Sequence, residues 1–282
     1  MQTLPGSPLS ASAILGAGTR LGLSLFGKLF LVTTALALVQ FIPTLIVAPH
    51  FGNGTVTPQE MLSAQLGGPM VLLQIACLLV LLLVQAVALS RLDHLATGTV
   101  ADYPGEIRKG LRVFPSLVGA FLLSFLIGII AMALAGAIGA LVGLLGALLF
   151  GKVGFVVLLI LVMLMMMLYV VMYLIFAQYS IVLEDCGPIQ AINRSFNLVY
   201  GNWWHVFAVL ILGVLCLLAV TVVAAVAMSP VMLMASGPDT GRSLFVSGVM
   251  QMVASAFLDP FILSVIYVLY RDLKLRSRPP AA

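Results

Sequence analysis

Apolar residues fill six long runs along the chain, and polar residues gather in the stretches between them. The runs cover residues 29–48, 70–90, 116–136, 155–183, 205–229 and 244–270. A helix needs about 20 apolar residues to cross the hydrocarbon core of a bilayer, and each run reaches that length. Because lipid offers no partner to backbone polar groups, the runs predict six transmembrane helices in an all-α integral membrane fold. The first run is too long for a signal peptide and lacks a cleavage site, so we expect it to be a retained span.

The length of the third run leaves one alternative open. As one helix, residues 116–150 would extend about 50 Å, so they could also form two spans and bring the total to seven. Basic residues favour six, because eleven of the thirteen Lys and Arg residues then lie on the side of the N-terminus, against eight for seven spans. The positive-inside rule places both termini in the cytoplasm. We expect residues 136–151 to form either an extended helix end or a hairpin at the outer face.

Composition agrees with this class and excludes several functions. Hydrophobic residues make up 62% of the chain, charged residues 8%, and the mean hydropathy is +1.22, whereas globular proteins carry about 25% charged residues. The net charge of +4 is modest and concentrated at span ends, so it indicates contact with membrane phospholipids and no nucleic acid. The three cysteines and three histidines lack metal-site spacing and catalytic motifs are missing, so we expect no enzyme, metal or cofactor.

A repeated unit organises the chain. Three arginines each precede an aromatic residue by six positions, in the pairs Arg20 and Phe26, Arg108 and Phe114, Arg194 and Tyr200. The pattern recurs after 88 and 86 residues, which predicts one membrane domain of three parallel repeats over residues 9–98, 99–186 and 187–282. Each repeat would comprise a short amphipathic helix at the cytoplasmic interface and a pair of spans.

The third of these linker helices has the clearest signals. Asp185 or Gly187 can cap it, Pro188 suits its first turn, and Gly201 can end it. One stripe is apolar and the opposite side polar: Ile189, Ile192, Phe196 and Val199 against Gln190, Asn193, Arg194 and Asn197. The second linker repeats this design after Pro104, with Ile107, Leu111 and Phe114 against Arg108, Lys109 and Arg112. The ordinary role of such helices is that of elbows that orient the next span. The alternative is a surface for lipid or a partner, and its candidate contacts are Arg108, Arg112, Arg194, Trp203, Trp204 and His205.

One segment resembles a known family. The run Leu183-Glu184-Asp185-Cys186-Gly187-Pro188, followed by Ala191, Arg194-Ser195 and Tyr200-Gly201-Asn202-Trp203-Trp204, resembles bacterial inner-membrane proteins related to the membrane domain of glycerophosphodiester phosphodiesterases. Asp259-Pro260 and Tyr270-Arg271-Asp272-Leu273 are also similar to that group. The resemblance implies six helices, a bacterial inner-membrane location and a link to envelope or phospholipid metabolism. The soluble phosphodiesterase domain of the fused members is lacking here, so their activity is not implied.

Within the spans, the acidic residue Asp259 is the sharpest candidate. A straight sixth span would place it about 16 Å deep, near the bilayer midplane, where a carboxylate is costly unless it is neutralised or hydrogen-bonded. Pro260 would break the helix there, and Asp259 could either cap the helix that restarts or couple a proton or substrate to transport. Gln251, Tyr169 and Tyr173 are further intramembrane polar candidates, for hydrogen bonds between helices or for a polar pathway.

Small residues at intervals of four form a ladder in the third run: Ala135, Gly139, Gly143 and Ala147. Such a ladder lets helices approach closely within the chain or between copies, which leaves a homo-oligomer open. The sequence thus predicts a non-enzymatic, multi-pass inner-membrane protein that binds lipid or other inner-membrane or envelope proteins in envelope or phospholipid homeostasis. The alternative is a transporter that uses a broken sixth helix and Asp259.

Overall fold

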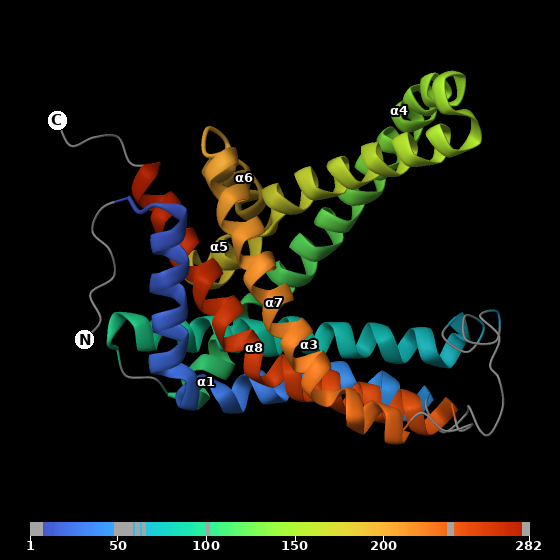
Figure 1. The fold of residues 1–282 in the computed structure, drawn as a ribbon. Coiled ribbons are helices and arrows are strands. Elements are labelled where there is room, and N and C mark those ends of the chain that lie inside the picture. The colour runs from blue at the N-terminus through green and yellow to red at the C-terminus, as the bar shows by residue number, and fades with distance from the viewer. Residues whose placement is uncertain are drawn as a thin grey trace. The chain divides into compact units, whose positions relative to one another are not determined.

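Helices account for all regular structure in the part of the chain that the computed structural model describes, residues 8–47, 59, 63, 66–99, 102–235 and 240–277 (Figure 1). They are α1 (Ala11–Val47), α3 (Gly68–Thr97), α4 (Tyr103–Leu174), α5 (Ala177–Glu184), α6 (Pro188–Val199), α7 (Trp203–Ala235) and α8 (Thr240–Arg276). Five helical stretches are long and apolar enough to cross a membrane: Ala11–Ile46, Gly68–Thr97, Tyr103–Glu184, Trp203–Pro230 and Arg242–Arg276. The expectation of an all-helical protein with several candidate membrane spans is therefore confirmed.

The helices group into two compact units. Unit 1 contains the described residues within Met1–Phe114 and Ala208–Arg276, and unit 2 contains those within Pro115–Phe207 and Ser277–Ala282. The three sequence repeats stay a prediction.

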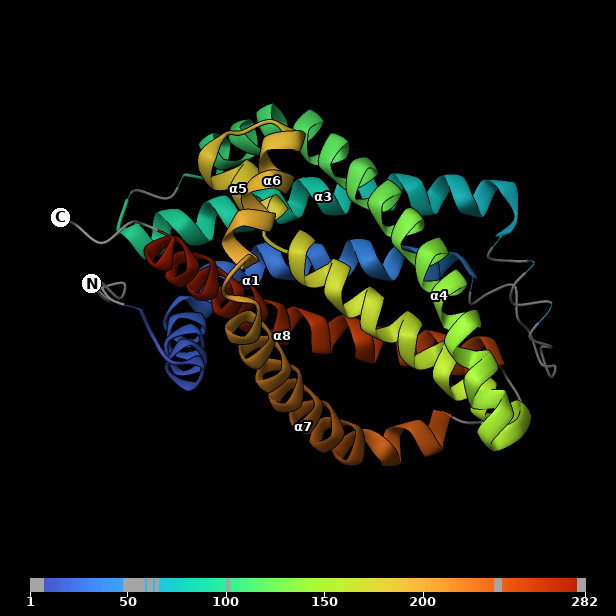
Figure 2. The same ribbon diagram turned by 90° about the horizontal axis from the view of Figure 1, so that it is seen from above.

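Helix α4 is a hairpin of two arms rather than one rod. Its backbone leaves the helical region at Gly151, which has a φ of 65° and a ψ of −154°, a conformation that glycine adopts at little cost. Figures 1 and 2 show the first arm running to this turn and the second arm returning beside it. The first arm is uninterrupted up to residue 150, so the alternative of two spans within residues 116–150 is wrong. The stretch 136–150 is an extended helix end.

The predicted small-residue ladder closes this hairpin. A Cβ on Gly139 would lie 2.9 Å from Leu159 Cδ1, one on Gly143 2.9 Å from Phe155 Cδ2, and one on Gly146 2.5 Å from the Gly154 oxygen. These distances are too short for a side chain, so Leu159 and Phe155 pack onto the ladder residues Gly139 and Gly143, and at Gly146, outside the ladder, the two backbones touch. The ladder therefore serves packing within the chain.

The fourth apolar run is not a single helix. A turn at Ile175 and Phe176 separates α4 from α5, although no glycine or proline marks it. This corrects the expected continuous span over residues 155–183. The interruption is hydrogen-bonded on both sides, because Ile175 N–H donates to Val171 O and Ser180 N–H donates to Phe176 O, each at 3.0 Å. The backbone thus changes direction without leaving these groups unsatisfied.

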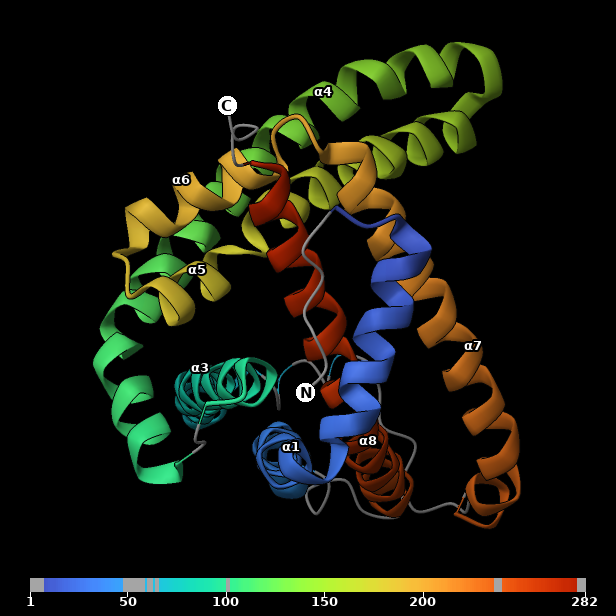
Figure 3. The ribbon, with the colours of Figure 1, turned by 90° about the vertical axis from the view of Figure 1, so that its left-hand side faces the viewer.

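Helices α1 and α8 pack antiparallel over most of their lengths in unit 1. The Phe26 ring lies 5.8 Å from Phe257, and the Phe41 ring lies 5.9 Å from Phe245. Nearer the start of α1 the two helices also approach closely, since a Cβ on Gly18 would lie 2.6 Å from the Val265 backbone. Both helices change direction along their length and do so together, as Figures 1 and 3 show.

Only the third linker helix is a separate element. It is α6, which begins at Pro188, is preceded by Gly187 at the N-cap and is followed by Gly201 with a φ of 81°, as the sequence predicts. Asp185 instead ends α5 in the left-handed region, with a φ of 49°. The first and second linkers are continuous with the spans that follow them, within α1 and α4. The short amphipathic helix expected before each pair of spans is therefore a separate element only at the third linker.

Candidate functional site

The helix ends of unit 1 meet in a polar network that we call the base. Its centre is Arg91 near the end of α3, which is 8% exposed. The Arg91 guanidinium donates to Glu106 Oε2 at 3.1 Å and to the Lys28 carbonyl at 2.9 Å, and its Cζ lies 3.7 Å from the centre of the Tyr103 ring. A single buried cation therefore joins α1, α3 and the first turn of α4. A buried ion pair needs further hydrogen bonds to offset desolvation, and the Lys28 carbonyl supplies one to Arg91.

Glu106 is fully buried and retains one oxygen without a hydrogen bond. The Nδ1 atom of His94 lies 3.5 Å from Glu106 Oε1, and both atoms are buried without a hydrogen-bonding partner. This separation exceeds an ordinary N–H···O hydrogen bond. The carboxylate is therefore held mainly by Arg91.

A second cluster ties α8 to α3 in the base. Tyr267 donates to Asp93 Oδ1 at 2.6 Å, and Arg271 donates to the same oxygen at 2.9 Å. Arg271 also donates to the Tyr267 hydroxyl at 3.0 Å. Because Tyr267 is buried and Arg271 is partly exposed, the cluster hides the phenol and leaves the cation at its edge.

The first and last described segments close on each other in the base. Buried Asp272 accepts from Leu9 N–H at 2.7 Å through Oδ1 and from Arg276 Nε at 2.7 Å through Oδ2. Arg276 also donates to the Leu9 carbonyl at 2.6 Å. We call this three-residue contact the clasp.

The second linker, the first turns of α4, presents its predicted polar residues outward. Arg108 and Arg112 are exposed and one turn apart, while Glu106 and Gly110 face inward. Gly110 allows this close fit, since a Cβ there would lie 3.1 Å from Val87 Cγ2. The predicted apolar stripe is not buried, because Ile107 is 46% exposed and Leu111 56% exposed. The outer surface is therefore basic and apolar together, because inward packing uses the glycine and the paired glutamate.

In unit 2, the predicted apolar stripe of α6 is partly buried in the protein and partly exposed. Ile192 and Val199 are buried, whereas Ile189 is 69% exposed. Arg194 forms an ion pair with Glu184 at the end of α5, and the Ser195 hydroxyl donates to the Tyr173 carbonyl at 2.5 Å. Arg194 is therefore committed to holding α6 against α5, which the sequence pattern did not reveal.

The tryptophan pair follows α6 as an aromatic cluster. The Trp203 ring stacks on Phe207 with centroids 5.3 Å apart and meets Trp204 edge-on at 4.7 Å. Trp204 is 75% exposed, and the Trp203 Nε1 atom is buried without a hydrogen-bonding partner. His205 is half-buried beside them. This combination of apolar rings and a polar N–H is typical of residues at a membrane interface.

Asp259 lies in a continuous helix, which corrects the expected break at Pro260. Pro260 cannot donate to the carbonyl of Ala256, four residues earlier. The buried Thr33 hydroxyl of α1 lies 3.3 Å from that oxygen and can supply the missing donor. Thr33 Oγ1 also lies near the Leu29 and Phe30 carbonyls, but only Ala256 O has lost its helical partner. A neighbouring helix thus repairs the ladder, as polar side chains do in membrane helices.

The register of the α1–α8 pair locates Asp259. Phe257, two residues before it, packs against Phe26 and Phe30, which flank Lys28 at the start of the first predicted span. Asp259 therefore lies level with the beginning of that span rather than with its middle. It is half-buried, and its Oδ2 atom is buried without a hydrogen-bonding partner.

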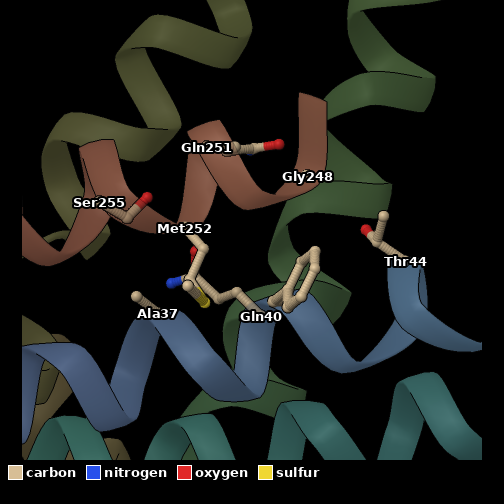
Figure 4. Close-up of a pocket in the computed structure, with 8 residues that line it drawn as sticks. Ala37, Gln40, Thr44, Gly248, Gln251, Met252 and Ser255 are labelled. Atoms are coloured by element: carbon tan, nitrogen blue, oxygen red, sulfur yellow. The ribbon is translucent and has the colours of Figure 1, made fainter. Parts of the chain in front are cut away.

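The other intramembrane candidates do not join Asp259 in one site. Gln251 lines a small pocket between α1 and α8 in unit 1 (Figure 4). The Tyr169 and Tyr173 rings lie 4.7 Å apart in unit 2, and Tyr173 also stacks on Phe196 of α6 at 4.8 Å. The tyrosine pair therefore takes part in packing α4 against α6.

No cluster of potential metal ligands occurs among the residues that the structure describes. Cys77 and Cys186 are buried and Cys216 is exposed, and all three are free thiols. Burial raises the pKa of the Cys186 thiol, in the turn between α5 and α6, and the nearby Asp185 carboxylate raises it further. This thiol is therefore less reactive than an exposed one at neutral pH.

Comparison with protein-family models finds a match over residues 9–273 to one described as "Domain of unknown function (DUF7847)". Searches of curated proteins and of solved structures found no match.

Proposed function

The chain belongs to the DUF7847 family, and we propose that it is a non-enzymatic membrane protein that binds anionic phospholipids through amphipathic helices at one membrane face. The proposed architecture has six spans in three parallel helix pairs, with residues 136–151 at the outer face and both termini in the cytoplasm. Its proposed setting is the bacterial inner membrane, in envelope or phospholipid homeostasis, with the base on the cytoplasmic side.

The second linker carries this proposal. Arg108 and Arg112 are exposed one turn apart, and among the described residues neither forms an ion pair. Exposed Ile107 and Leu111 stand beside them. A helix with basic and apolar side chains on its outer surface suits the boundary between headgroups and acyl chains, where phosphates pair with arginine and apolar side chains enter the hydrocarbon.

Burial of matching positions supports the repeat. With offsets of 88 and 86 residues, three sets of equivalent positions have the same burial: Gly18, Glu106 and Ile192 are buried; Leu25, Val113 and Val199 are buried; Arg20, Arg108 and Arg194 are exposed. Contacts at the span ends support it too. In unit 1, Arg91 links a span end to the second linker and the clasp links one to the first; within unit 2, Glu184 links a span end to the third. Each linker is thus held by the end of another span.

Asp259 supports the second candidate, a transporter, less well. Its unpartnered Oδ2 atom favours a role in proton coupling. However, α8 is continuous, and the register sets Asp259 level with Lys28, near the charged base. An acid at that level can contact interfacial water, so its presence does not require transport.

The test uses the purified protein in nanodiscs of phosphatidylcholine with a minor fraction of phosphatidylglycerol, and native mass spectrometry to measure retained phosphatidylglycerol. The Arg108→Gln/Arg112→Gln variant should retain it more weakly by about tenfold to thirtyfold, since each basic residue near an anionic surface contributes about 1 kcal/mol. The matched control is Lys152→Gln/Arg242→Gln, which removes two charges from the predicted opposite face. Equal loss in both variants, or loss in neither, would contradict the proposal.

A further inference from the structure

The pocket between α1 and α8 combines polar side chains with a position inside an apolar helix pair. It has a volume of about 40 Å³ and is lined by Ala37, Gln40, Phe41, Thr44, Gly248, Gln251, Met252 and Ser255. Figure 4 shows Gln40 and Thr44 on one helix and Gln251 and Ser255 on the other. Two amide and two hydroxyl side chains thus belong to the lining, one of each from either helix.

Its depth follows from the helix register. Gln40 lies twelve residues beyond Lys28 in the same helix, which corresponds to about 18 Å at 1.5 Å per residue. The hydrocarbon core is about 30 Å thick. If Lys28 marks the membrane boundary, the pocket is past the midplane, well inside the hydrocarbon. In this helix pair, the polar side chains deep in the hydrocarbon are therefore those of the pocket, whereas Asp259 lies near its boundary.

The pocket exists because the spacing between α1 and α8 changes along the pair. A Cβ on Gly248 would lie 2.6 Å from Thr44 Cγ2 and 2.7 Å from Phe41 Cε2, so the helices touch there. One turn further along α8, Met252 and Ser255 replace the glycine, and Ala37 faces them from α1. The pair is thus closed at Gly248 and leaves a gap beside the glutamines.

The lining selects one class of ligand. None of the eight lining residues is ionisable, so a charged group would enter hydrocarbon without compensation. An amide can both donate and accept hydrogen bonds, which suits a hydroxyl or carbonyl. A water molecule needs about 10–15 Å³ of such volume, so the pocket admits a group of a few heavy atoms and no large headgroup.

We propose that this pocket binds the neutral hydroxyl or ester carbonyl of a membrane-dissolved acylglycerol, whose acyl chains remain in the surrounding lipid. Both glutamines are exposed at the pocket, so the ligand can enter sideways from the bilayer. The site is separate from the basic linker surface, and its failure would leave the phospholipid proposal untouched.

The probe is dioleoylglycerol, present as a minor component in phosphatidylcholine nanodiscs that hold the full chain. Native mass spectrometry should find one dioleoylglycerol bound to the wild-type protein. In Gln40→Leu/Gln251→Leu the retained fraction should fall about tenfold, the loss expected for two hydrogen bonds within a membrane. Ser255→Leu fills the pocket without removing an amide and should cause the same loss, which guards against misfolding of the double variant.

Gln74→Leu in α3 is the matched control, because it removes a polar residue from another predicted span and does not line the pocket. Its retained dioleoylglycerol should equal that of the wild type. The proposal is overturned if the wild type binds none, if the control loses as much as the pocket variants, or if the pocket variants convert a dimer into a monomer. The last outcome would assign the glutamines to contact between two copies.

Discussion

At the scale of single residues, two of the prolines inside the long helices, Pro260 and Pro230, have a hydroxyl group near the carbonyl that lost its helical donor. Pro260 leaves the Ala256 carbonyl without its helical partner, and Thr33 of another helix lies 3.3 Å from it. Pro230 does the same to Val226, whose oxygen accepts from Ser229 Oγ at 2.8 Å. Each hydroxyl can supply a donor in place of the missing N–H, and at Pro260 the helix continues where the sequence alone suggests a break.

The role of Thr33 can be tested with an isosteric substitution. Thr33→Val removes the donor and keeps the volume, so it should lower the free energy of unfolding in detergent by about 1 kcal/mol. Thr34→Val is the control, since the Thr34 hydroxyl is buried without a partner and its removal should be neutral or stabilising. An equal effect at both positions would show that the Ala256 contact is not what stabilises the pair.

The buried ion pair predicts a larger effect. Glu106→Gln keeps the shape of the side chain and removes its charge, which leaves the Arg91 guanidinium, with a side chain 10% exposed, without a counter-charge. Unfolding followed by the fluorescence of the tryptophans should show a loss of about 3 kcal/mol. Asp102→Asn, an exposed acid four residues earlier, should change stability by less than about 0.5 kcal/mol.

At the scale of helices, composition and periodicity predict where elements exist better than how they pair. Pro188 in the first turn and Gly201 after the last turn predict α6, because both residues act through local backbone geometry. The turn at Ile175 and Phe176 has no such local signal. The orientation of the second linker was also beyond the pattern, since its inward face is set by Glu106 meeting Arg91 and by Gly110 fitting against Val87.

The α4 hairpin gives a prediction at this scale. Gly154→Leu should force the arms apart, because a Cβ there would collide with the backbone oxygen of Gly146. Oxidative cross-linking of a cysteine pair at Gly136 and Met163, where a Cβ on Gly136 would lie 3.9 Å from Met163 Cε, should then fall several-fold relative to the parent pair. Gly128→Leu has open space around its Cβ and should leave the cross-linking yield unchanged.

At the scale of the whole molecule, the arrangement of spans predicts which parts of the chain share a side of the membrane. Asp102 lies just before α4 in the base, and Lys152 follows the turn at Gly151. In a cysteine-free background, an impermeant maleimide should label Asp102→Cys and Lys152→Cys from opposite sides of the membrane. Labelling of both from one side would contradict a hairpin that crosses the membrane between them.

Sequence and structure contribute differently at this scale. Hydropathy alone identifies the helical membrane class, since each run must satisfy its own backbone. The base depends on contacts between distant residues, such as Asp93 with Arg271, and neither side chain indicates its partner in the sequence. Asp259 shows the same limit, because its depth depends on how α8 pairs with α1 and not on its distance from the end of the run.

The pairing of α1 with α8 also sets the order of events during synthesis. Thr33 and Ala256 are 223 residues apart, and Leu9 is 263 residues from Asp272. A ribosome adding about 5–20 residues per second needs roughly 11–45 s to cover the shorter separation. Throughout that interval the face of α1 that contacts α8, including Gly18 and Gly22, has no α8 to pack against. Unit 1 can therefore be completed only after its last helix has been inserted.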